Sequence, residues 1–393
     1  MAFALPVWLA VHEELLRHGE ADCGTCSCFD EFDDEALFQL FHLSRPCVAF
    51  IADAVRGRLK TLPLDEPGLP ADAMVMLALN YYAHGVNSAP VLQRVGLSQA
   101  DGAALVVGTV SGVVAAMSDE FISFPLSPGA KANVASKVEG LCGIPRVLGV
   151  LAPAHFKIRA SPYEKNSFRS FVNTLGYTSV VSQIVCDSDG NVLSVDRCCV
   201  GSTCEQEMWE SSSEGKEMEK ELLGSYWVVG GKGYHLSTHI LTPLSVPDGE
   251  SEIRFNEAHA KIHSVMRTTL GSLKRRFRCL MQLGFAQEAS LNKKSNIIKA
   301  CCVLHNIAKK FSVPPPPPAG KIEALHPGKQ LSAPAEVDPE ALQARQKVID
   351  ENFSVVSSSQ DPAGNVTEES ERAEPVCRLL EEASSTHHGQ TLD

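Results

Sequence analysis

The chain has 393 residues, which is enough for two domains or for one large domain and a tail. Its formal net charge of −12 excludes a protein that coats nucleic acid with its whole surface. No segment combines a basic start, a long apolar core and a small-residue cleavage site, and no apolar run reaches membrane-spanning length. We therefore expect neither secretion nor a membrane partner.

Residues 1–145 are predicted to form an N-terminal helical domain. Apolar residues recur at helical spacing over 32–60 and 74–82, and 103–117 is an unusually apolar helical segment. Residues 86–99 outline a helix-turn-helix, with Gly96 in the turn and a second helix that starts at Ser98. The start of that second helix has no Arg or Lys, so we expect it to pack rather than to read DNA.

Residues 146–312 are predicted to form a second domain of the α/β class. Alternating and apolar runs indicate strands, Asp189-Gly190 fits a hairpin turn, and long basic-apolar helices end near Phe311. Strands are expected at 146–158, 177–187, 192–200 and 226–229, and helices at 205–223 and throughout 255–311. A cluster of strands followed by helices favours an α/β layer fold.

The remaining residues, 313–393, are predicted to form a disordered acidic tail. A run of five prolines, 314–318, excludes a continuous helix at its start. The tail holds six basic and fourteen acidic residues and few aromatic ones, so it cannot bury enough surface to fold alone. Within the tail we expect helical pieces at 339–349 and 374–383.

Five short motifs occur in a fixed order, and the last one is quite specific. They are GVLAPAHFKI at 149–158, FVNTLGY at 171–177, the strand and loop 227–236, LKRRFRCL at 273–280 and ACCVLHNI at 300–307. As an ordered set they resemble the Harbinger transposase-derived nuclease family of DDE superfamily endonucleases. The resemblance implies an RNase H-like core, a preceding helical domain with a helix-turn-helix, and two-metal phosphodiester cleavage by three acidic residues.

None of the three acidic residues of that family is present at its matching position. The first-strand Asp is Ala152, the second-strand Asp is Gly231, and the helical Glu is Arg267. Two-metal catalysis needs hard oxygen ligands, and none of these side chains supplies one. The sequence therefore predicts a domesticated, catalytically inactive protein without a metal cofactor.

The alternative is a divalent-metal endonuclease that uses displaced carboxylates with Mg²⁺ or Mn²⁺. Five acids lie near the matching motifs: Asp187, Asp189, Asp196, Glu164 and Glu257. We interpret Asp187 as a turn or capping acid rather than as a metal ligand.

Two other groups of potential ligands are interpreted as structural. Cys23, Cys26 and Cys28 have zinc-like spacing without a second pair nearby, so we interpret them as loop thiols. His155 and His305 fall in apolar motifs and are expected to be buried and hydrogen-bonded.

A basic stretch, 254–310, has twelve Lys or Arg residues against two Glu. Its most basic positions are candidates for nucleic-acid contact or nuclear import: Lys274, Arg275, Arg276, Arg278, Lys293 and Lys294. The other interpretation is a solvated helix face. Members of the family work beside a Myb/SANT-like trihelix DNA-binding protein. The resemblance therefore implies such a partner, DNA as a further candidate, and a location in nucleus and cytoplasm.

Overall fold

A six-stranded mixed sheet forms the centre of the fold. The computed structural model describes residues 28–60, 69–97, 100–159, 168–220, 225–284, 291–317 and 338–354. All of these lie within one of the two compact units of the chain, Met1–Ser354. The strands are β1 (Val147–Lys157), β2 (Ser179–Cys186), β3 (Val192–Val195), β4 (Cys199–Val200), β5 (Trp227–Gly230) and β6 (Ile240–Leu241).

The strand order is β3-β2-β1-β5-β6, with β4 also paired to β2. Strand β2 is antiparallel to β1, β3 and β4, whereas β1, β5 and β6 run parallel. This mixed α/β arrangement is consistent with the RNase H-like core expected from the sequence. In β1 every residue except Lys157 is buried, because both faces of the strand are covered.

The hairpin between β2 and β3 turns at the predicted dipeptide Asp189-Gly190. Gly190 has φ of +79°, a conformation that side chains disfavour, and a Cβ there would lie 2.7 Å from Oγ1 of Thr269. Glycine is therefore required both by the turn and by its close approach to the helix above it.

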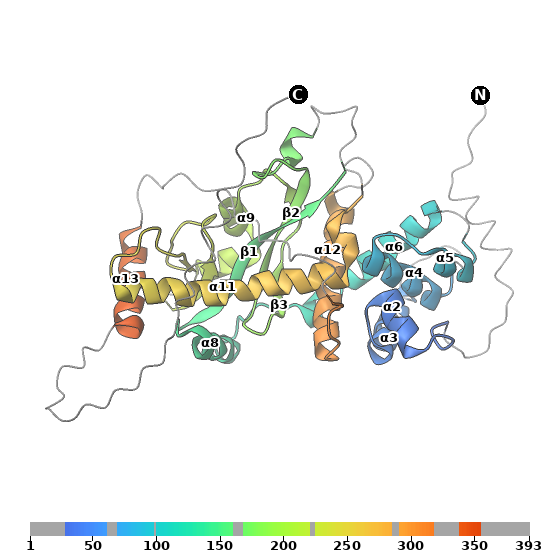
Figure 1. Cartoon of the computed structure of the whole chain (residues 1–393), viewed down its shortest axis with the longest axis horizontal. Coiled ribbons are helices and arrows are strands. Elements are labelled where there is room, and N and C mark those ends of the chain that lie inside the picture. The colour runs from blue at the N-terminus through green and yellow to red at the C-terminus, as the bar shows by residue number, and fades with distance from the viewer. Residues whose placement is uncertain are drawn as a thin grey trace, which may run out of the picture. The chain divides into compact units, whose positions relative to one another are not determined.

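Helices cover both faces of this sheet, and the helices α2 to α8 precede its first strand in the chain. Their bounds are α2 (Asp34–Phe41), α3 (Arg45–Leu59), α4 (Ala71–His84), α5 (Ala89–Arg94), α6 (Ala100–Ala115), α7 (Ser118–Phe121), α8 (Pro128–Cys142), α9 (Glu205–Ser211), α10 (Ser213–Met218), α11 (Glu250–Arg276), α12 (Leu291–Lys310) and α13 (Pro339–Phe353). Two short 3-10 helices are η1 (Arg169–Phe171) and η2 (Arg278–Met281). The long helix α11 runs past the sheet in Figure 1, with α13 at its N-terminal end.

The main hydrophobic core joins the N-terminal helices to the strands. Helix α6 packs on α12 and α4, and its buried Val107 and Val110 share one apolar cluster with Cys301 and Leu304 of α12. A second cluster on the opposite face of the sheet holds Trp209 of α9. The expected boundary at 145/146 thus marks a change from helix to strand within a shared core.

Four sequence predictions need correction. The expected helix 205–223 is two helices, α9 and α10, because Ser212 between them is extended and its side chain caps α10. The helical stretch 32–60 is two helices, because His42 ends α2 in the left-handed conformation with φ of 54°. The returning strand 192–200 is split into β3 and β4. Residues 339–353, placed in the disordered tail, form α13, which confirms the helical piece expected there. Helix α13 packs on α11 because Val348 and Ile349 are buried and Phe353 contacts the Phe255 ring at 5.8 Å.

Candidate functional site

The structure brings together the first two of the three positions at which the resemblance implies metal-binding acids. Strands β1 and β5 are parallel neighbours, and Leu151 is paired with Gly230. Ala152 is the next residue of β1 and Gly231 directly follows the last residue of β5, so the two positions are neighbours at the end of this pairing. Ala152 is only 3% exposed, so its methyl group is part of the hydrophobic core rather than of a hydrated site.

Helix α11 places a histidine against the second position. A Cβ added to Gly231 would lie 3.3 Å from Nε2 of His263, so this imidazole fills part of the space that an acidic side chain would take. His263 stacks on His259, with ring centroids 5.9 Å apart and planes 15° apart. His259 donates from Nε2 to the carbonyl of Gly230 at 3.0 Å. Arg267 follows one helical turn after His263.

Sequence reasoning missed both histidines. The signal that could have found them is their spacing, since positions 259, 263 and 267 recur every four residues and therefore lie on one face of α11.

The site is cationic and lacks carboxylates. Burial lowers the pKa of His259 to about 4, with His263 as the second cause. Burial, and then the nearby charge of Arg267, lower the pKa of His263. Both imidazoles are therefore neutral at pH 7, and the exposed Arg267 supplies the charge.

The metals that the family implies do not fit these residues. Ala152 and Gly231 offer no donor atom, and Arg267 is a cation where Mg²⁺ needs oxygen ligands. Within the described parts of the chain, no group of three or more His, Cys, Asp or Glu side chains could hold a metal ion.

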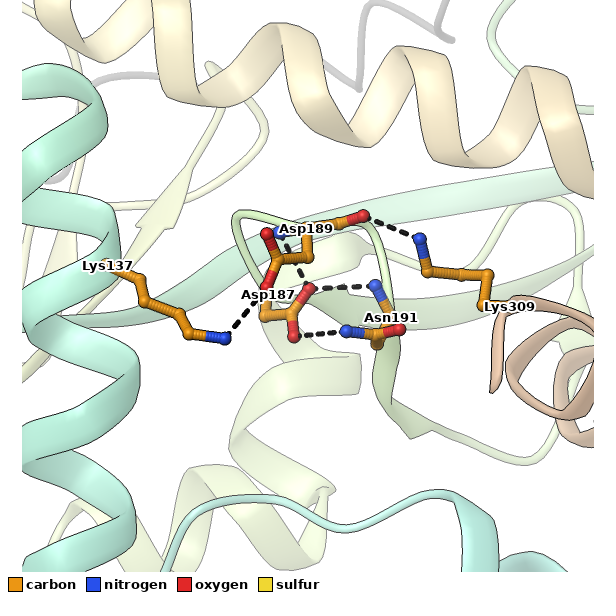
Figure 2. A network of polar contacts seen from close by, with 5 residues as sticks. All are labelled: Lys137, Asp187, Asp189, Asn191 and Lys309. Atoms are coloured by element: carbon orange, nitrogen blue, oxygen red, sulfur yellow. Dashed lines mark hydrogen bonds and ion pairs between the residues drawn. The ribbon is translucent and has the colours of Figure 1, made fainter. Parts of the chain in front are cut away.

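Of the candidate displaced acids, Asp187 has a structural role in the hairpin. Its carboxylate accepts hydrogen bonds from the backbone of Asp189 (2.9 Å), the backbone of Asn191 (2.8 Å) and the side chain of Asn191 (2.7 Å) (Figure 2). This supports its interpretation as a turn acid. Asp189 forms an ion pair with Lys137 of α8 at 2.9 Å. Glu257 is exposed on α11, and Glu164 lies outside the described residues.

Asp196 is the most unusual of these acids. It follows β3 and accepts a hydrogen bond from Nε2 of Gln183 at 3.2 Å. Burial, and then the charge of Glu214, raise the pKa of Asp196 to about 7. Gln183 also accepts a hydrogen bond from the hydroxyl of Tyr234 at 3.0 Å. The carboxyl group thus ends a partly buried polar chain that runs through Gln183 to Tyr234.

We expect Asp196→Asn to change how stability depends on pH. Because the folded-state pKa is raised, the folded chain keeps a proton between about pH 4 and pH 7 that the unfolded chain releases. The contribution of Asp196 to the free energy of unfolding therefore falls as pH rises through this window. Urea unfolding should be measured for both proteins at pH 4.5 and at pH 7.5. Between these pH values the free energy of unfolding of the variant should rise relative to that of the native chain by at most about 4 kcal/mol.

The pH dependence of the native chain alone does not isolate Asp196, because other groups make the free energy of unfolding rise with pH. Burial lowers the pKa of His259 and of His305 to about 4, so their contributions to stability fall as pH falls. Both histidines are present in both proteins and cancel in the difference. A difference that stays constant across the pH range would contradict the raised pKa of Asp196.

The predicted basic patch is not one surface. Arg276 is 2% exposed and Lys294 is 3% exposed, which corrects their interpretation as phosphate contacts. Lys274 donates to the carbonyl of His155 at 3.3 Å and lies over the Phe156 ring. The remaining candidates differ in exposure: Arg275 is half-buried, whereas Arg278 and Lys293 are exposed.

The other sequence-predicted groups have structural roles. Helices α5 and α6 follow the helix-turn-helix outline, with Gly96 at φ of 73° between them, but α6 buries one face against α12 and α4. His155 contacts Oγ of Ser179 at 3.0 Å, and His305 donates to the carbonyl of Gly190 at 3.1 Å. Both are buried, as expected. Cys28 is a free thiol, whereas Cys23 and Cys26 lie outside the described residues.

Fold and site together define a nuclease-type α/β protein that has no carboxylate at residues 152, 231 and 267. The family model for the DDE superfamily endonuclease matches residues 154–306. The chain is 31% identical over 327 residues to the rat protein named "Putative nuclease HARBI1", covering 83% of this chain and 92% of that protein. The human protein of the same name is 30% identical over 327 residues, with the same coverage. The chain belongs to the Harbinger transposase-derived nuclease family of DDE superfamily endonucleases.

Plant relatives are more distant. Protein ALP1-like of Arabidopsis thaliana is 24% identical over 298 residues, covering 70% of this chain and 71% of that protein. The Arabidopsis protein named Antagonist of Like Heterochromatin Protein 1 is 38% identical over 82 residues, covering 21% of this chain and 20% of that protein. No solved structure matches the chain. Among the helices described, none is long and apolar enough to cross a membrane.

Proposed function

We propose that this protein is a domesticated transposase relative that acts by binding and does not cleave phosphodiesters. The observation that carries this proposal is the replacement of all oxygen ligands at Ala152, Gly231 and Arg267, together with the imidazole of His263 beside Gly231. A cation and a neutral imidazole cannot hold two divalent metals. The fold remains fully packed around this site, because β1 and β5 are buried along their lengths except at Lys157.

The proposed partner is a Myb/SANT-like trihelix DNA-binding protein, and the proposed location is the nucleus and the cytoplasm. Support comes from the family resemblance and from the plant relative whose printed name describes antagonism of another protein. Direct DNA contact is a further part of the proposal. Helix α11 has no Asp or Glu between 258 and 276, and Arg267 is exposed on it.

Two experiments test the proposal. A plasmid-nicking assay of the full chain with Mg²⁺ or Mn²⁺ should show no cleavage. Tagged full-length chain, purified from nuclear extract, should recover a protein with a Myb/SANT-like domain. Metal-dependent nicking that is lost in Asp196→Asn would instead support the endonuclease that uses displaced carboxylates. Purification without any DNA-binding partner would contradict the binding role.

DNA contact has its own measurement. If α11 contacts phosphates, affinity for duplex DNA should fall steeply with salt and should fall further in Arg267→Glu. The charge-matched control is Lys310→Glu, because Lys310 is an exposed lysine on α12. Equal loss in both variants would indicate nonspecific attraction and contradict a contact at Arg267.

A further inference from the structure

A polar cleft lies on the side of α11 away from the degenerate site. Its volume is about 490 Å³, and it is bounded by the β2–β3 turn, α11, the C-terminal half of α12 and the segment that follows α12. Residues 265 and 269 of α11 line it, whereas His263 and Arg267 do not. Positions two residues apart on a helix point about 200° away from each other. The cleft is therefore separate from the site beside Gly231.

Hydroxyl groups dominate the polar wall of this cleft. They belong to Ser188, Ser264, Thr268, Thr269, Ser272 and Ser312. Thr268 donates to the carbonyl of Ser264 over a long 3.3 Å, so its hydroxyl can turn toward a ligand at little cost. Ser272 accepts a hydrogen bond from Arg275, which leaves its own proton available to donate.

The charge of the cleft is positive. Two basic residues, Lys309 and Arg276, line it. Among the described residues that line it, Asp189 is the one acid. The carboxylate of Asp189 pairs with Lys137 on the far side of the turn (Figure 2). Lys309 donates to the backbone carbonyl of Asp189 at 2.8 Å, and that bond leaves its charge unneutralised.

Buried nitrogens without hydrogen-bond partners mark the inner wall. Nε of Arg276 and Nδ1 of His305 are buried, and the described residues offer neither a partner. Arg276 is 2% exposed and His305 is 5% exposed, and both residues line the cleft. The Nε–H of Arg276 is a donor that an anionic oxygen or a water in the cleft would satisfy, whereas Nδ1 of the neutral His305 is an acceptor that only a donor such as water would satisfy.

We propose that this cleft binds the phosphate group of a small ligand, with Lys309 as the counter-charge and the hydroxyls of Thr268 and Ser272 as donors. A tetrahedral oxyanion accepts several hydrogen bonds at once, and a lysine ammonium serves it as a point charge. Asp189 does not repel the anion strongly, because its ion pair with Lys137 is directed away from Lys309. The site is independent of the proposed binding to DNA or to a protein partner.

The test measures binding of inorganic phosphate to the full chain. Isothermal titration calorimetry and ³¹P NMR line broadening should both show saturable binding at constant ionic strength. Lys309→Met should weaken the affinity roughly tenfold to hundredfold, because a hydrogen bond to a charged group contributes about 1.5–3 kcal/mol. Thr268→Val, which is nearly isosteric, should weaken it several-fold. Lys310→Met is the matched control, since the adjacent Lys310 lies over the Phe50 ring outside the cleft.

Adenosine 5′-monophosphate and adenosine distinguish the possible sources of the phosphate. Tighter binding of the monophosphate than of inorganic phosphate, without binding of adenosine, would identify a phosphate ester as the ligand. Binding of inorganic phosphate alone would identify the free ion. Absence of saturable binding, or equal affinity in Lys309→Met, Thr268→Val and Lys310→Met, would overturn the proposal. If Lys309→Met fails to fold, Thr268→Val alone decides between these outcomes.

Discussion

Replacement of Arg276 by methionine is expected to lower the free energy of unfolding by about 3–5 kcal/mol. The guanidinium donates to the carbonyl of His42 at 2.5 Å and to that of Val313 at 2.7 Å. The backbone carbonyl of Arg276 in turn contacts Nδ1 of His42 at 2.8 Å. One side chain thus joins the C-terminal ends of α2 and α12 to the end of α11.

The large effect follows from burial. Burial lowers the pKa of Arg276 to about 10, so the group remains charged at neutral pH. The carbonyls at helix C-termini carry partial negative charge, which partly compensates the buried cation. Methionine keeps the apolar stem but removes every donor, and it leaves two buried carbonyls without their partner.

Urea unfolding followed by circular dichroism measures this loss. Arg278→Met is the matched control, because Arg278 lies two residues later and is exposed; it should change stability by less than about 0.5 kcal/mol. Arg276→Lys should lie between the two, since a single ammonium does not reproduce the planar fork. Equal unfolding midpoints for Arg276→Met and Arg278→Met would show that Arg276 does not join the three helices.

Restoring the acids is expected to restore metal binding. In the variant Ala152→Asp, Gly231→Asp, Arg267→Glu, the first carboxylate is on β1 and the second directly follows β5, its parallel neighbour. Without metal this variant should be less stable than the native chain, because position 152 is buried and the carboxylates repel one another. Mn²⁺ at a hundredfold excess over its dissociation constant should then raise the melting temperature by roughly 4–8 °C, whereas the native chain should not respond.

His263 provides a sharper version of this experiment. Its Nε2 lies 3.3 Å from the Cβ position of residue 231, so it crowds the restored Asp. Adding His263→Ala should therefore strengthen Mn²⁺ binding. The matched control is Ala154→Asp, Gly231→Asp, Arg267→Glu, in which Ala152 is kept. Ala154 suits this purpose because Ala152 and Ala154 are both 3% exposed and belong to the same face of β1. A native chain stabilised by Mn²⁺ as strongly as the restored variant would refute the degenerate site.

Much of the α/β core could be predicted from local sequence patterns. Strands β1 and β2 and the turn at Asp189-Gly190 follow from apolar runs and turn chemistry. The burial of His155 and His305 was also foreseeable from the apolar motifs around them. By contrast, the two-residue strand β6 was missed, since a segment this short carries no periodicity.

The basic stretch shows why such patterns fail for single side chains. In sequence, Arg276 is one of several adjacent cations and resembles a solvated face. In the structure Arg276 bonds to residues beyond the ends of α2 and α12, so two segments distant in sequence decide its environment. Helix α13 is similar, because its short apolar face is stabilised by packing on α11, a helix distant in sequence.

The sequence by itself determined that positions 152, 231 and 267 carry no carboxylate, because these identities are read directly and no folding can add one. Tertiary structure alone decided what replaced them. The position of His263 depends on the rotation of α11 against β5, and the polar cleft depends on α11, α12 and the β2–β3 turn meeting. Residues that are distant in sequence but in contact leave no local periodic signal. Their positions depend on how helices and strands pack on one another and not on the spacing of residues within one element.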